Sequence, residues 1–260
     1  MISMSKSQIA AKGPFATLGG AQTDGGKTTI AKNLCHYLRT LGVDAKHLMV
    51  DKAENPSDGE DLRLETTDRD FRRLIEALNS SGPDQLAVID LGGHAFEKFM
   101  VYNKAFGNEA SADIQMYIIP VMVNTKEAVV LTTIDKFVAL GVEPSQLVIV
   151  FNRVLGDDEA AEIPAKFPQL HAAAADLGFR ICSEPVFMAQ TIADLRGKEG
   201  NLFERAAWDR KAIQERYKAA MAADDQIVSD REFRALTDRG QAIEPSNNFV
   251  KVFTEILGLK

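Results

Sequence analysis

The sequence predicts an α/β fold, a doubly wound and mostly parallel sheet covered by helices on both faces, with extra C-terminal helices. Two observations carry this prediction. Short runs of consecutive apolar residues recur along the first two thirds of the chain, and such runs are typical of strands buried on both faces of a parallel sheet. Amphipathic segments separate these runs, and strands that alternate with helices form right-handed βαβ units.

Each apolar run has the length of a buried strand. The candidate strands are Phe15–Leu18, Lys46–Val50, Leu86–Leu91, Gln115–Val121, Leu147–Phe151 and Phe179–Cys182. The segments between them place apolar residues on one helical face, and a glycine commonly ends such a helix. The predicted helices are the segment after the first strand, with Ile30, Leu34, Leu38 and Leu41 before Gly42; Asp68–Ser80, with Phe71, Leu74, Ile75 and Leu78; and Lys126–Leu140, with Val130, Ile134, Phe137 and Val138 before Gly141.

The last third of the chain carries helical patterns. A long amphipathic helix is predicted over Asn201–Ala223, which contains the only tryptophan, Trp208. A polar connection, Asp224–Asp230, and a short helix, Glu232–Arg239, follow. Ser246 is expected to cap a closing helix. The apolar face of that helix consists of Phe249, Val250, Phe253, Ile256 and Leu257.

We interpret residues 1–260 as one domain. Within it, residues 1–13 form a flexible lead and residues 196–260 form a helical extension that packs on the same domain. The composition, 45% hydrophobic and 26% charged, excludes a disordered or collagen-like chain. A chain of 260 residues buries enough surface to fold without a disulfide or a structural metal.

Charge and cysteine content narrow the class of protein. A formal net charge of −7 argues against nucleic-acid binding by bulk charge, so such binding needs a local basic patch. Cys35 and Cys182 lie far apart, with no Cys or His at metal-ligand spacing, which indicates a reducing compartment and argues against a zinc site. Because no apolar run reaches about 18 residues, no membrane span is expected. We therefore expect a soluble, cytoplasmic protein.

The most informative stretch is Gly19–Thr29, GGAQTDGGKTT, between the first strand and the first helix. Phosphate binding needs accessible backbone N–H groups at a helix N-terminus, a lysine for the β and γ oxygens, and a hydroxyl group for magnesium. The segment Asp24–Thr28 supplies each of these, although Ala21 replaces the first glycine of the strict pattern GxxxxGK[ST]. A glycine-rich turn with an exposed lysine is the simpler alternative, but it does not explain why Lys27 and two hydroxyl groups begin the helix together.

Acidic residues end two of the predicted strands. Asp90 lies at the end of one apolar strand, and Asp51 ends another. Because the carboxyl ends of parallel strands form the ligand-binding edge of a sheet, Asp90 is expected to hold magnesium through water, as a Walker B carboxylate does. For Asp51, a magnesium ligand and a helix cap or turn residue remain equal alternatives.

These residues resemble the ParA/MinD group of P-loop ATPases, the deviant Walker A proteins of plasmid partition, division-site placement and conjugative transfer. In that group the loop reads KGGVGKTT, with Asn-Leu three residues later. Here Gln22–Thr29 occupies the loop, and Asn33 and Leu34 occupy the later positions. The resemblance covers residues 14–190, and in chain length the StbB and TraL plasmid proteins are similar to this chain.

The resemblance implies a Mg-ATP-binding switch with weak ATPase activity in plasmid partition, plasmid stability or conjugative transfer. It implies ATP/ADP and Mg²⁺ as ligands, an ATP-dependent homodimer, and a protein partner from a partition or transfer system. The implied nucleotide-binding residues are Gln22, Thr23, Asp24, Gly25, Gly26, Lys27, Thr28, Thr29, Asn152, Arg153 and Pro185; the magnesium ligands are Thr28, Asp90 and Asp51; and the catalytic residues are Lys27 and Asp51. Adenine is favoured because the guanine-reading pattern Asn-Lys-x-Asp is absent from the sequence.

The loop departs from the group's pattern in ways that bear on hydrolysis. Gln22 stands where the group has the lysine that reaches across an ATP-sandwiched dimer, and a neutral side chain neutralises phosphate charge less well. Ala53 replaces the second acid of the Asp-x-Asp pair, with Glu54 beside it. Slow or partner-dependent hydrolysis is therefore expected.

Three further interpretations remain open. Gly20–Asp24 also resembles the GTDT loop of dethiobiotin synthetase, which would make the chain an ATP-dependent small-molecule synthetase with Lys52 at the substrate. His94 is either a nucleotide contact or a loop histidine bonded to backbone. Nonspecific DNA binding competes with a solvated helix face. The basic residues that favour DNA are Arg196, Lys198, Arg205, Arg210, Lys211, Arg216 and Lys218.

Overall fold

A computed structural model of the chain describes residues 15–18, 26–50, 62–64, 67–79, 85–92, 95–105, 114–188 and 201–259. The chain divides into two compact units. Unit 1 comprises Met1–Met188 and Lys251–Lys260, and unit 2 comprises Ala189–Val250. Across the described residues, no helix combines the length and the hydropathy that a membrane span requires.

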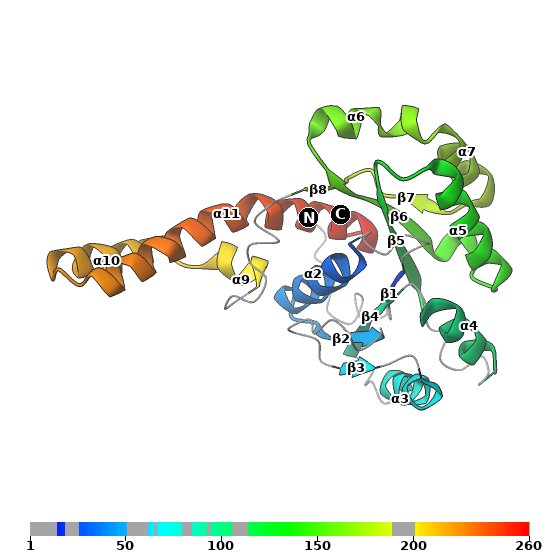
Figure 1. The fold of residues 1–260 in the computed structure, drawn as a ribbon, viewed down its shortest axis with the longest axis horizontal. Coiled ribbons are helices and arrows are strands. Elements are labelled where there is room, and N and C mark those ends of the chain that lie inside the picture. Colours follow the sequence, from blue (N-terminus) through cyan, green and yellow to red (C-terminus); the bar gives the residue numbers. More distant parts are fainter. Residues whose placement is uncertain are drawn as a thin grey trace. The chain divides into compact units, whose positions relative to one another are not determined.

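Unit 1 is built on a parallel sheet (Figure 1). Over the described ranges its strands are β1 (Phe15–Leu18), β2 (Asp44–Val50), β3 (Leu62–Leu64), β4 (Gln85–Leu91), β5 (Met116–Met122), β6 (Leu147–Val154), β7 (Arg180–Ile181) and β8 (Val186–Phe187). The strand order is β3-β2-β4-β1-β5-β6-β7, β8 pairs with β6, and every pair is parallel. The predicted α/β fold with a parallel sheet is therefore confirmed.

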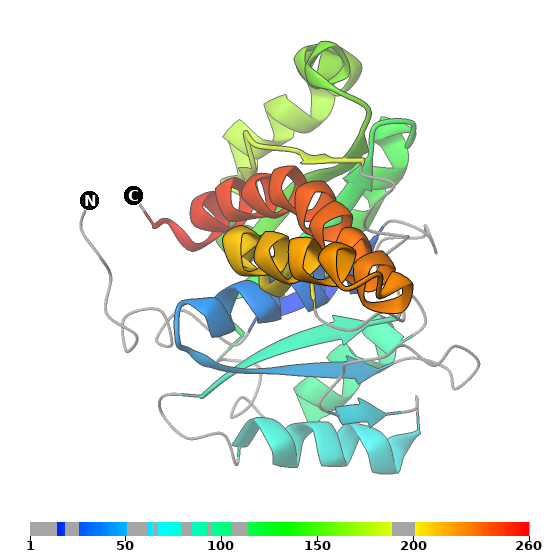
Figure 2. The same ribbon diagram turned by 90° about the vertical axis from the view of Figure 1, so that its left-hand side faces the viewer.

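Helices cover both faces of this sheet. They are α2 (Lys27–Thr40), α3 (Asp68–Asn79), α4 (Ala95–Ala105), α5 (Glu127–Ala139), the 3-10 turn η1 (Pro144–Gln146), α6 (Asp157–Lys166) and α7 (Pro168–Leu177). Phe71, Phe96 and Phe137 bring α3, α4 and α5 into one apolar core with alternate strand residues such as Ile89 and Ile119. Helix α2 covers the other face, as Figures 1 and 2 show.

A second segment joins α2 on that face. The last turns of α11 (Gln226–Leu257), residues 251–257, belong to unit 1. The Tyr37 hydroxyl and Thr254 Oγ1 form a hydrogen bond of 3.1 Å, and the rings of Tyr37 and Phe253 lie 5.7 Å apart between centroids. Phe253 and Leu257 are fully buried. The C-terminal turns of α11 therefore form part of the core of unit 1.

Most predicted elements of unit 1 are present with shifts of one or two residues at their ends, except that β6 continues to Val154, three residues beyond the predicted end at Phe151. The last predicted strand, Phe179–Cys182, is shorter than expected, because the ladder with β6 includes only Arg180 and Ile181. On α5, Val138 was predicted to belong to the apolar stripe but is 38% exposed, so this assignment is wrong. The elements β3, α4, α6, α7 and β8 were not predicted from the sequence. The strands β3 and β8 are very short, and the helices α4, α6 and α7 contain no long apolar run.

In unit 2, the predicted helix over Asn201–Ala223 is wrong. The structure has two helices there, α9 (Leu202–Ala207) and α10 (Arg210–Ala222). They separate because Asp209 caps α10: its Oδ1 accepts hydrogen bonds from the backbone N–H groups of Lys211 (2.9 Å) and Ala212 (3.3 Å). An N-cap residue adopts non-helical backbone angles, so it begins a new helix.

The predicted break before Ser246 is also wrong. One helix, α11, runs from Gln226 to Leu257 and passes through Pro245. Ser246 lies inside it, where its hydroxyl donates to the carbonyl of Ile243 at 2.8 Å. Proline disfavours a helix interior by about 3 kcal/mol, but Ala242 and Phe249 on either side of it are fully buried. Tertiary packing of these turns outweighs the local preference.

Helices α10 and α11 lie side by side (Figures 1 and 2), and a buried carboxylate joins them. Glu232 of α11 is 3% exposed and accepts hydrogen bonds from Arg216 Nε (3.0 Å) and Arg231 Nη2 (2.8 Å). Burial raises the pKa of Glu232, but these guanidinium groups outweigh burial and hold it below its ordinary value of 4.5. The carboxylate is therefore charged at neutral pH.

We expect Glu232→Gln to weaken the pairing of α10 with α11 by about 1–2 kcal/mol at neutral pH, since both arginines are exposed and water screens their charge. A lowered folded-state pKa adds stability above the unfolded value near 4.5, and this stability is lost as the pH falls through the folded value. Hydrogen exchange of α10 and α11 measures both effects, with the exposed Glu215→Gln as control. Equal protection in both variants at neutral pH would contradict the prediction.

Candidate functional site

The strand order places the carboxyl end of β1 at a topological switch point of the sheet. The chain passes from β1 over β4 to reach β2, and it later crosses from β4 to β5 on the other side of β1. The connections that follow the neighbouring strands β1 and β4 thus run in opposite directions, and ligands of open parallel sheets commonly bind at the carboxyl edge beside such a point. The segment predicted to bind phosphate joins β1 to α2 and so belongs to this edge.

Helix α2 begins at Lys27, directly after Gly26. Gly26 has φ 82° and ψ 21°, the left-handed region that side chains disfavour. It is also crowded, because a Cβ atom at this position would lie 2.1 Å from Nδ2 of Asn152. Asn152 is 3% exposed near the end of β6. The structure thus brings together two residues that the sequence assigned to one nucleotide site from widely separated positions.

The first turn of α2 combines a lysine with the start of a helix. Lys27 is 7% exposed, and no acidic residue lies in this turn. Among the described residues, no side chain caps the start of α2. The partial positive charge of a helix N-terminus favours an anion, and a lysine side chain adds a positive charge of its own. The half-buried hydroxyl-bearing residues Thr28 and Thr29 continue the turn.

Asp90 lies at the same edge of the sheet. It is 2% exposed, and in register it pairs with Thr17 of β1 and Met49 of β2. Because β1 ends at Leu18, one residue beyond this level, the chain enters the phosphate segment beside Asp90. Asp90 therefore lies at the level where β1 ends and the segment predicted to bind phosphate begins.

The sequence reading missed a histidine beside this carboxylate. His47 of β2 is 1% exposed, and its Nε2 atom lies 3.9 Å from Oδ2 of Asp90. The sequence contains an indication of this contact, because His47 is a polar residue inside the predicted strand Lys46–Val50. The prediction of that strand used only its apolar residues. Thr125 was missed too: it follows β5 at the carboxyl edge and is 8% exposed.

The other side of the edge is formed by β6 and β8. Asn152 pairs in register with Val186, so Pro185 lies next to the end of β6. Pro185 is buried. Arg153 is exposed and has φ 59°, a conformation that costs a non-glycine residue about 1–3 kcal/mol. The predicted base-binding residues Asn152, Arg153 and Pro185 thus form one continuous segment of the edge.

Several predicted site residues lie outside the described residues. They are Gln22, Thr23, Asp24, Gly25 and Asp51, together with Lys52, Ala53, Glu54 and His94. Asn33, matched to the group's Asn-Leu, lies within α2, where its side chain donates to the Thr29 carbonyl at 2.8 Å.

The donor set of the described edge fits a magnesium nucleotide. Thr28 and Asp90 offer a hydroxyl and a carboxylate, the hard oxygen ligands that magnesium prefers. Gly26, which has no side chain, lets Asn152 pack against the backbone at the helix start, where a Cβ would collide with it. Lys27 adds the positive charge that a polyphosphate requires.

Two members of the basic segment considered for DNA binding are engaged with carboxylates. Arg205 is 2% exposed, forms an ion pair with Asp238, and places its guanidinium 5.3 Å from the centroid of the Trp208 ring. Arg216 is engaged with Glu232. Neither guanidinium is therefore available as a simple phosphate contact, which weakens the predicted patch. The Trp208 ring contacts the guanidinium of Arg205, which accounts for a tryptophan at this position.

Comparison with models of known protein families gives no match, and no curated protein sequence matches the chain.

Proposed function

We propose that this chain is a P-loop nucleotide-binding protein. The observation that carries the proposal is the start of α2, where a glycine in the left-handed region, packed under Asn152, precedes a nearly buried lysine and two threonines. This arrangement lies at the carboxyl edge of the central strand of a parallel sheet. Asp90, buried beside β1, supports a divalent cation at the same place.

More particularly, the sequence pattern favours a Mg-ATP-dependent switch of the ParA/MinD type, cytoplasmic, which forms an ATP-dependent homodimer and acts with a protein partner in plasmid partition, stability or transfer. In this proposal Lys27 neutralises the β and γ phosphates, and Thr28 and Asp90 hold the magnesium ion, directly and through water respectively. Asn152, Arg153 and Pro185 frame the adenine. The bound magnesium ion supplies charge neutralisation on the phosphates. Gln22 and Ala53 make slow or partner-dependent hydrolysis the expected behaviour.

The test combines nucleotide titration with light scattering on size-exclusion chromatography, with no nucleotide, with ADP, and with a slowly hydrolysed ATP analogue, each with Mg²⁺. We expect saturable binding of both nucleotides and a doubling of mass with the analogue alone. Binding without a change of mass would contradict the switch and favour a synthetase or a partner-dependent scaffold. Absence of nucleotide binding would overturn the proposal as a whole.

A further inference from the structure

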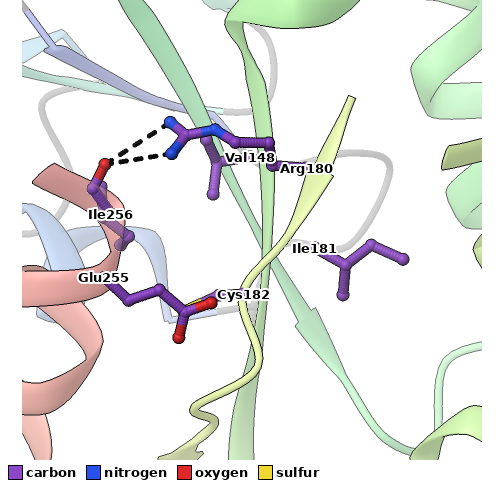
Figure 3. Close-up of a pocket in the computed structure, with 6 residues that line it drawn as sticks. All are labelled: Val148, Arg180, Ile181, Cys182, Glu255 and Ile256. Carbon is purple, nitrogen blue, oxygen red and sulfur yellow. Dashed lines mark hydrogen bonds between the residues drawn. The ribbon is translucent and has the colours of Figure 1, made fainter. Parts of the chain in front are cut away.

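The end of helix α11 holds the turn that precedes Pro185. The Glu255 carboxylate accepts hydrogen bonds from the backbone N–H of Ser183 (2.7 Å), the hydroxyl of Ser183 (2.9 Å) and the backbone N–H of Glu184 (3.1 Å). Figure 3 shows Glu255 beside Cys182, across a small cavity between α11 and β7. One side chain thus binds three donors of two consecutive residues.

The state of the carboxylate strengthens this contact. Burial raises the pKa of Glu255, but the donors of Ser183, Cys182 and Glu184 outweigh burial and lower it, so the group is charged at neutral pH. The Cys182 thiol, buried and bonded to this carboxylate, has a raised pKa and stays protonated as a donor. Hydrogen bonds to a charged acceptor are about twice as strong as neutral ones.

The support behind Glu255 is fixed on two sides. Arg180 of β7 donates from both terminal nitrogens to the carbonyl of Ile256 at 3.4 Å (Figure 3). Thr254, the preceding residue of α11, shares a hydrogen bond with Tyr37 of α2. The helix turn that carries Glu255 is therefore attached both to the sheet and to the helix that begins with Lys27.

A continuous series of contacts leads from this turn to the candidate site. Ser183 and Glu184 precede Pro185, and Val186 pairs with Asn152 in the sheet. Asn152 lies directly over Gly26 at the start of α2. A displacement of residues 183–184 therefore changes the position of Pro185 at the base-binding side, whereas α2 holds its phosphate-binding turn through its own contacts with the sheet.

We propose that Glu255 is a positioning residue that fixes the 183–185 turn in the conformation that receives the base of the bound nucleotide. This inference rests on the proposed function. If Glu255 has this role, two separate parts of the site determine binding. The start of α2 supplies affinity for the phosphates, and the end of α11 sets affinity for the nucleoside.

The experiment compares binding of Mg-ATP with binding of inorganic triphosphate and Mg²⁺ to the full chain. In Glu255→Gln, an NH2 group replaces one of the two carboxylate oxygens and the charge is lost, so at least one of the backbone N–H groups of Ser183 and Glu184 loses its acceptor and the turn is held less firmly, while side-chain volume is kept. We expect about a tenfold loss of ATP affinity and unchanged triphosphate affinity. Ser183→Ala, which removes one hydroxyl at an exposed position, should shift ATP affinity in the same direction by less. Glu76→Gln, exposed on α3, is the matched control and should change neither affinity.

Three results would overturn the inference. Thermal unfolding of each variant is recorded as a control for folding. If Glu255→Gln does not fold, the comparison is made with Ser183→Ala. Unchanged ATP affinity in both variants, or equal loss for ATP and triphosphate, shows that Glu255 does not position the base. Wild-type protein that binds neither ligand overturns the proposed function, and this inference with it.

Discussion

Lys27→Ala is expected to lower the affinity for Mg-ATP by about 100-fold or more, with little change in the stability of the fold. The ammonium group lies at the first residue of α2, 7% exposed, in a turn without an acidic residue. Each charge-assisted hydrogen bond to phosphate contributes about 1.5–3 kcal/mol, and about 1.4 kcal/mol corresponds to a factor of ten. Isothermal titration with Mg-ATP measures the loss, and urea unfolding measures stability.

A second lysine of the same helix provides the control. Lys32, half-buried in α2, lies more than one turn from the helix start. Lys32→Ala removes the same charge from the same helix and should alter ATP affinity by less than about threefold, because Lys32 lies beyond the first turn and the attraction between charges weakens with distance and is screened by salt. Equal losses in both variants would show a general effect of charge rather than a phosphate contact of Lys27. Normal binding by Lys27→Ala would remove the main support for the proposed function.

Gly26→Ala is expected to destabilise unit 1 by about 2–5 kcal/mol and to abolish nucleotide binding. An alanine in the left-handed region costs about 1–2 kcal/mol. The added Cβ would also lie 2.1 Å from Nδ2 of the buried Asn152, which must move. Overpacking of this kind costs a further 1–3 kcal/mol or so. Denaturation in urea measures the total.

The chain offers a matched control for the strain term. Gly178, at the end of α7, has φ 83°, almost the value of Gly26, but a Cβ there meets nothing within 4 Å. The loss of stability in Gly178→Ala therefore measures backbone strain without steric overlap. The difference in stability loss between the two variants measures the cost of the overlap with Asn152. Adding Asn152→Ala to Gly26→Ala should recover that difference. If Gly26→Ala costs no more than Gly178→Ala, the close packing of Gly26 against Asn152 is refuted.

The sequence was sufficient for the parts of the fold that follow from local periodicity. The strands β2, β4 and β6 are long apolar runs buried on both faces, and their predicted ends lie within two residues of the observed ones, except at the end of β6, which continues three residues past Phe151. Helix α5 was also predicted, because its apolar residues recur at helical spacing. Helices α6 and α7 carry few large apolar residues, so periodicity did not reveal them.

The candidate site shows a similar limit. Gly26 and Lys27 were predicted because glycine and lysine have distinct roles where a strand leads into a helix, and Asn152 was found through the resemblance. The packing of Asn152 on Gly26 is a tertiary contact that no local pattern encodes. Glu255 could not be predicted at all, since a carboxylate on a helix is usually solvated and its donors lie about 70 residues earlier.

Helix α11 belongs to unit 2 up to Val250 and to unit 1 from Lys251 onward, and this has a consequence for synthesis of the protein. Tyr37 and Thr254, which bond to each other, are 217 positions apart. While the ribosome makes the intervening residues, the outer side of α2 lacks the contacts that Thr254 and Phe253 later make with Tyr37. The nascent sheet therefore presents apolar surface to chaperones until translation is nearly complete. A message truncated before codon 251 would yield a chain that folds in part and is destroyed by proteases rather than retained as a smaller, working domain.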